Sequence, residues 1–178
     1  MRKAVFDPNA RKASFAPVAD AGTRLLVLGS LPGEISLQRA QYYAHPQNQF
    51  WRLMGAAVGA DLAAAPYESR LALLRSHGVG LWDVVQSARR AGSLDGAIRE
   101  HRPNALVELA GSLPELRAIA FNGATAARIG RQTFGPAPHW DLVALPSSSA
   151  AHTLRFEAKV AQWLTLQRYL APDASPIR

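Results

Sequence analysis

The sequence contains no cysteine, and this absence excludes disulfides, thiolate zinc sites, iron–sulfur clusters and cysteine nucleophiles. Its five histidines show no His-x-x-x-His spacing, so we expect no metal site and no cofactor. No apolar run approaches the roughly 18–20 residues of a membrane span. The basic N-terminus, Met1-Arg2-Lys3, is not followed by the hydrophobic stretch of a secretory signal. We therefore expect a cytoplasmic protein without membrane segments.

Charged residues are also few, at 19% of the 178 residues, whereas apolar residues make up 48%. This composition is typical of a folded globular protein. The length suits one domain with a substantial core. We predict a single domain over residues 1–178, with an irregular leader over 1–23 and a polar tail over 171–178.

Lysine is scarce among the basic residues, which are 17 arginines and 3 lysines. The chain has 13 acidic residues. The net charge is +7 and the pI is near 10.5. No block of five like charges occurs, which indicates a folded basic surface rather than a charged tail. Arginine binds phosphate bidentately, so this surface suits nucleic acid. GC-rich coding or a need for solubility would explain the same enrichment.

Short apolar runs alternate with segments of helical spacing along the chain. This alternation predicts a parallel sheet with helices on both faces. Ligands bind such sheets at the carboxyl ends of the strands, and we expect a polar loop over 30–45, after the first strand. Buried strands are expected at residues 24–29, 79–85, 116–121 and 141–145. Helices are expected from Pro46 or Gln47 to Gly59, from Pro66 to His77, after an Asn104 cap, from Gly123 to about Arg131, and over 156–170.

The segment from Tyr42 to Trp51 carries four aromatic residues, a histidine and an asparagine at a predicted loop-to-helix junction. The Asn48 amide offers a donor and an acceptor, which suits a base edge or the orientation of a water molecule. Phe50 has the helical spacing of a core residue, and it would otherwise stack on a planar ligand. His45 suits either a phosphate contact or a buried imidazole.

Polar residues also follow the other predicted strands. Asp83 interrupts an apolar strand, where a carboxylate is costly unless it has a function or pairs with Arg89 or Arg90. Residues 146–152, Pro-Ser-Ser-Ser-Ala-Ala-His, supply hydroxyl and backbone N–H groups that suit a phosphate, although serines also cap helices. The glycine-bearing turn 29–33 matches neither a dinucleotide fingerprint nor a phosphate loop.

Taken together, these segments resemble the uracil-DNA glycosylase superfamily, and within it the hypoxanthine-DNA (deoxyinosine) glycosylase branch, often called family 6. The resemblance implies a three-layer α/β/α sandwich around a four-stranded parallel sheet. It also implies a monofunctional DNA glycosylase of base-excision repair, which flips a damaged base from DNA and hydrolyses its N-glycosidic bond. The matching segments are residues 28–37, 41–51, 80–85, 92–95, 121–123 and 145–149.

The resemblance also implies roles for individual residues. Asn48 matches the asparagine taken as catalytic in this branch, where it positions the water or polarises the base. Leu31 stands where sister branches carry Asp or Asn, and Asp83 stands where many uracil enzymes carry Asn. The expected base-binding residues are Phe50 as the stacking platform, Asp83 and Asn122 as readers of the base edge, and the turn residues Ser30 and Gly33. The expected DNA-phosphate contacts are His45, Ser147, Ser148, Ser149 and His152, of which His152 could instead assist the leaving base.

The expected partner is single- or double-stranded DNA that contains a deaminated base, either hypoxanthine, uracil or xanthine. We expect a monomer that works in the cytoplasm on the nucleoid. One alternative is a damaged-DNA-binding module with the same fold and no turnover, because Leu31 replaces a catalytic group of the sister branches. Another is a small-molecule enzyme that holds a phosphate between turn 29–33 and the serines, although no nucleotide motif supports it.

Overall fold

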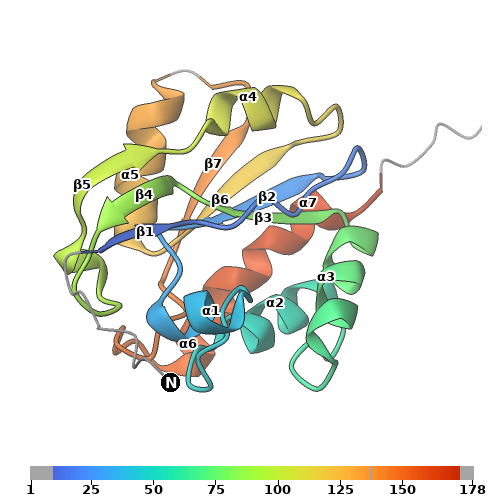
Figure 1. The fold of residues 1–178 in the computed structure, drawn as a ribbon. Coiled ribbons are helices and arrows are strands. Elements are labelled where there is room, and N and C mark those ends of the chain that lie inside the picture. The colour runs from blue at the N-terminus through green and yellow to red at the C-terminus, as the bar shows by residue number, and fades with distance from the viewer. Residues whose placement is uncertain (1–9, 137, 173–178) are drawn as a thin grey trace, which may run out of the picture.

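The computed structural model describes residues 10–136 and 138–172, and its centre is a four-stranded parallel sheet (Figure 1). The strand order is β3-β2-β6-β7. The two inner strands, β2 and β6, are buried at every position, as is typical of parallel strands covered on both faces. All four strands match the apolar runs in the sequence. They are β2 (Leu25–Gly29), β3 (Val79–Asp83), β6 (Ala118–Asn122) and β7 (Asp141–Leu145).

Helices cover both faces of this sheet, which confirms the predicted three-layer α/β/α sandwich (Figure 1). Leu25 and Val27 point into one hydrophobic core, and Leu26 and Leu28 point into the other. This alternation follows from the two-residue period of a strand. The first core lies against α2 (Phe50–Val58), α3 (Tyr67–Ser76), α6 (Phe156–Trp163) and α7 (Gln167–Leu170), and the second against α4 (Leu106–Gly111) and α5 (Ala124–Phe134).

A second, antiparallel sheet was not predicted from the sequence. It joins β1 (Arg11–Ala13), β4 (Val85–Arg89) and β5 (Arg99–Pro103) in the order β1-β4-β5. The prediction of an irregular leader over 1–23 is therefore wrong at β1, and the expected strand 79–85 is two strands of different sheets. Every residue of β5 is exposed, so this strand lacks the apolar alternation by which strands are recognised.

Side-chain hydrogen bonds move two predicted helix starts. Helix α2 begins at Phe50 rather than near Pro46, because Asn48 Oδ1 accepts the Phe50 N–H at 3.0 Å in an Asx turn. Asn104 does not cap α4, because its side-chain amide donates to the carbonyl oxygen of Asp83 at 2.8 Å. The Asn48 side chain therefore fixes the backbone at the start of α2, and the Asn104 side chain is bound to the end of β3.

Two other predicted segments differ from the structure. The expected loop 30–45 contains α1 (Glu34–Arg39), a helix of only 6 residues, which is too short to show a helical period in the sequence. The expected helix 156–170 is interrupted by a 3₁₀ turn over Leu164–Leu166. Most of the predicted polar tail lies outside the described residues. Within the described ranges, no helix is long and apolar enough to cross a membrane.

Candidate active site

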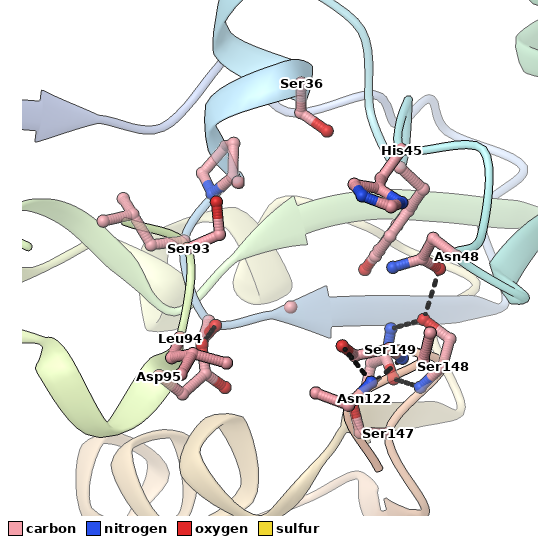
Figure 2. Close-up of a pocket in the computed structure, with 18 of the residues that line it drawn as sticks. Ser36, His45, Asn48, Ser93, Leu94, Asp95, Asn122, Ser147, Ser148 and Ser149 are labelled. Atoms are coloured by element: carbon pink, nitrogen blue, oxygen red, sulfur yellow. Dashed lines mark hydrogen bonds between the residues drawn. The ribbon is translucent and has the colours of Figure 1, made fainter. Parts of the chain in front are cut away.

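A cavity of about 690 Å³ opens at the carboxyl end of the parallel sheet (Figure 2). Strand ends supply part of its wall, since Ser30 follows β2, Asp83 ends β3 and Asn122 ends β6. This is the edge at which open α/β sheets bind ligands, as expected from the sequence. The predicted site residues that line it are Ser30, Gly33, His45, Asn48, Asp83, Asn122, Ser147, Ser148, Ser149 and His152.

Two asparagines from distant parts of the chain meet at one serine on the cavity wall (Figure 2). The Ser148 hydroxyl lies 2.8 Å from Asn48 Oδ1 and 2.8 Å from Asn122 Nδ2. The Ser148 N–H donates to Asn122 Oδ1 at 2.8 Å. Asn48 Oδ1 also accepts the Phe50 N–H. Because Asn48 Oδ1 is occupied by two donors, Asn48 presents its Nδ2 to the cavity as a hydrogen-bond donor (Figure 2).

Tyr42 and Tyr43 are the tyrosines that line the cavity, whereas Phe50 does not line it. Phe50 is fully buried in the core and does not line the cavity, so it has no free face for a ligand. Tyr43 lines the cavity and stacks on Phe50, with ring centroids 3.8 Å apart and ring planes 11° apart. Tyr43 also has φ +53°, a left-handed conformation that is uncommon outside glycine and often occurs at functional sites.

Asp83 is a buried carboxyl at the end of β3, with 4% of its surface exposed. Gly29 makes room for it, because a Cβ at Gly29 would lie 2.7 Å from Asp83 Oδ1 and 2.9 Å from the Tyr43 hydroxyl. Burial raises the pKa of Asp83 to about 7, and the positive charge of Arg90 opposes this rise. The alternative of an ion pair with Arg89 is not realised, since Arg89 lies 3.5 Å from Glu100.

Arg90 is a buried side chain that supports the turn after β2. It donates to the backbone oxygens of Leu31 and Pro32 rather than to Asp83. Leu31 is itself buried, so this position brings no polar group to the cavity. Asp95 is a site residue that sequence reasoning missed, although it ends the motif segment 92–95. It accepts a hydrogen bond from the Ser30 hydroxyl at 2.5 Å, and burial raises its pKa.

The serines after β7 belong to a loop, residues 146–152, that we call the serine loop. Ser148 is 1% exposed and its hydroxyl is bonded to two asparagines, so it is not available to a phosphate as predicted. The Ser147 hydroxyl accepts the Ser149 N–H at 3.1 Å, and the Ser149 hydroxyl accepts the Ala151 N–H at 3.2 Å. The backbone N–H groups of this loop are thus mostly used within the protein, while His152 is exposed at the cavity.

Residues 16–170 match the family model of the Uracil DNA glycosylase superfamily. The chain belongs to the uracil-DNA glycosylase superfamily. This membership confirms three expectations from the sequence, which are the family, the fold class and a DNA glycosylase activity. The roles of individual residues in this superfamily member stay predictions.

Two relatives of this superfamily member come from species of Methanosarcina. A protein named hypoxanthine DNA glycosylase from Methanosarcina barkeri is 36% identical over 153 residues, which cover 86% of this chain and 96% of the relative. A protein of the same name from Methanosarcina acetivorans is 37% identical over 158 residues, with 89% and 99% covered. The solution NMR structure of a candidate uracil DNA glycosylase from Methanosarcina acetivorans has a TM-score of 0.79 and 36% identity, and the match covers 90% of this chain and 99% of that one.

Proposed function

We propose that this DNA glycosylase removes hypoxanthine from DNA and leaves an abasic site. The observation that carries the proposal is that the same cavity is lined by a fixed amide donor, Asn48, and by a buried carboxyl, Asp83. Hypoxanthine carries both a donor and acceptors on its edge, so it complements a wall of this kind. The two relatives named hypoxanthine DNA glycosylase support the choice of base.

Tyr43 is the stacking platform in this proposal, in place of Phe50. Its ring is held from behind by Phe50 at 3.8 Å, so a flipped base stacks on a surface that is already positioned. Phe50 keeps an indirect role, because it fixes the plane of the Tyr43 ring. The core position that helical spacing favoured for Phe50 agrees with its full burial.

Asp83 and Asn122 read the base edge in this proposal. The ionised Asp83 carboxylate accepts the N1–H of hypoxanthine. Asn122 Nδ2 uses one hydrogen for the Ser148 hydroxyl, which leaves its second hydrogen for O6 of the base. Ser30 and Gly33 shape the adjacent wall, and the Ser30 hydroxyl is already bound to Asp95.

Asn48 acts on the base rather than on the water. Cleavage of the C1′–N9 bond leaves its electron pair on the base and positive charge on the sugar. Asn48 Nδ2 donates a hydrogen bond to the base as this negative charge develops, which is electrostatic stabilisation by a preorganised donor. Water then adds to C1′ and loses a proton, while the leaving base gains one.

The mouth of the cavity supplies the phosphate contacts in this proposal. His45 and His152 are exposed there, and the Ser147 and Ser149 hydroxyls still have a hydrogen to donate. The remaining expectations from the sequence are a single domain, a monomer, and a cytoplasmic location on the nucleoid, and they stay predictions.

The test uses oligonucleotides with one hypoxanthine, uracil or xanthine, single-stranded and in duplex, followed by alkali cleavage at abasic sites. We expect strand breaks at hypoxanthine with the wild type. Asn48→Ala should abolish them while the Kd for the same DNA changes less than about 3-fold. Gln132→Ala, an exposed amide on α5, is the matched control and should retain full activity.

Turnover by Asn48→Ala would refute the catalytic role of this residue. Binding of damaged DNA by the wild type without any alkali-labile site would favour the alternative of a damaged-DNA-binding module, to which the buried Leu31 points. Breaks at uracil or xanthine but not at hypoxanthine would refute the choice of base and leave the glycosylase activity intact.

A further inference from the structure

Ser148 has every polar atom engaged within the protein, although it lies on the cavity wall and is only 1% exposed. Its N–H donates to Asn122 Oδ1 at 2.8 Å, and its carbonyl oxygen accepts the Gln49 N–H at 2.9 Å. Its hydroxyl is 2.8 Å from both Asn122 Nδ2 and Asn48 Oδ1. A side chain in this state has no group left for DNA.

The direction of each bond follows from the chemistry of the groups. Asn122 Nδ2 can only donate, so the Ser148 oxygen accepts there and the Ser148 hydrogen is free to donate to Asn48 Oδ1. The Ser148 N–H in turn fixes the Asn122 carbonyl. One serine thereby sets the orientation of two amides that are 74 residues apart in the sequence and lie together on one wall of the cavity (Figure 2).

Lys159 ties the serine loop to the start of α2 independently of the Ser148 side chain. It is fully buried, and its Nζ donates to Gln49 Oε1 at 3.0 Å and to the Ser149 carbonyl oxygen at 3.1 Å. The loop that carries Ser148 is therefore held in place even when the Ser148 hydroxyl is removed. Loss of the hydroxyl should change the Asn48 and Asn122 amides more than the loop itself.

We propose that Ser148 is a positioning residue for base excision, and that it acts by directing Asn48 Nδ2 and the free hydrogen of Asn122 toward the flipped base. This inference rests on the proposed glycosylase mechanism. It replaces the phosphate contact that the sequence suggested for Ser148. Misplacing a catalytic group by about 1 Å lowers a rate about 100-fold, and this is the effect expected when the hydroxyl is lost.

The test measures single-turnover excision rates and DNA Kd values for Ser148→Ala, Ser148→Thr and Ser148→Val. Threonine and valine have the same shape and differ only in the hydroxyl, so this pair separates hydrogen bonding from packing. We expect rates about 100-fold below wild type for Ala and Val, substantial recovery for Thr, and Kd values within about 3-fold of wild type for all three. Ser112→Ala, at the exposed end of α4, is the control serine.

Several outcomes would overturn the proposal. A weaker Kd with an unchanged excision rate in Ser148→Ala would make Ser148 a DNA contact. Equal rates for the Thr and Val variants would show that shape rather than the hydroxyl matters. If neither of these two variants folds at the assay temperature, a wild-type rate in Ser148→Ala still refutes the proposal. Failure of the wild type to cut any lesion would instead refute the proposed function itself.

Discussion

Replacing Asp83 by asparagine removes a charge from a buried site, and we expect the protein to become more stable at pH 8. Asp83 is 4% exposed, and its Oδ2 has no hydrogen-bond partner among the described residues. Burial is the largest cause that raises its pKa from 3.8 to about 7, against the opposing charge of Arg90. At about 1.4 kcal/mol per pH unit, this difference corresponds to about 4 kcal/mol.

The direction of the pH effect follows from proton linkage at Asp83. The folded protein keeps the Asp83 proton until about pH 7, whereas the unfolded chain releases it near pH 4. Raising the pH through this window therefore favours the unfolded state of the wild type. Asp83→Asn has no such proton, so its stability relative to the wild type rises by about 4 kcal/mol between about pH 4 and 7 and levels off above that range.

Urea denaturation at about pH 4.5, 6 and 8 measures the free energy of unfolding of both proteins. Asp61→Asn, which removes an exposed carboxyl after α2, is the control for the loss of one negative charge. An advantage of Asp83→Asn that is the same at all three pH values would refute the reasoning. It would mean that the Asp83 charge is already compensated in the folded protein.

Other predictions concern the cavity residues Tyr43 and Asp83 and the buried side chain of Arg90. Tyr43→Leu loses the stacking ring, so the Kd for hypoxanthine-containing DNA should rise about 10-fold; an equal rise with undamaged DNA in fluorescence anisotropy would contradict this. Arg90→Met removes the side-chain donor to the backbone oxygens of Leu31, Pro32 and Gly92 and should lower the free energy of unfolding by about 3 kcal/mol in urea, whereas exposed Arg75→Met should not. The rate of hypoxanthine excision should rise with pH through about 7 as Asp83 ionises. Asp83→Asn should lose this pH dependence and shift the base preference toward uracil. A pH profile that is unchanged in Asp83→Asn would show that Asp83 does not read the base.

Hydrophobicity was a sufficient guide to the central sheet but not to the antiparallel one. The strands β2 and β6 are buried on both faces, and this burial requires the continuous apolar runs visible in the sequence. Strand β5 is held by backbone hydrogen bonds to β4, and all five of its residues are exposed. The residue types of β5 therefore do not indicate that it pairs with β4, and the pairing is visible only in the folded structure.

The sequence motifs identified the segments that form the cavity wall, but they did not show which side chains face the cavity and which are buried. Phe50 and Tyr43 are both aromatic residues of one segment, and the period of α2 already favoured a core position for Phe50. The ring that reaches the cavity is set by the left-handed turn at Tyr43, which a sequence pattern does not encode. The three consecutive serines likewise divide into the buried Ser148 and two half-buried neighbours only because β7 ends beside β6.

Motifs and strand order in the sequence are enough to predict the family, the parallel α/β architecture, and the presence of Asn48, Asp83 and Asn122 at the cavity. The tertiary structure decided how these groups face a ligand. Asn48 and Ser148 are 100 residues apart, and the hydrogen bond between them fixes which atom of the Asn48 amide faces the cavity. The orientation of the Asn48 and Asn122 amides and the burial of the Asp83 carboxyl depend on neighbours that are distant in the sequence. The chemistry of the site is therefore set by the tertiary structure.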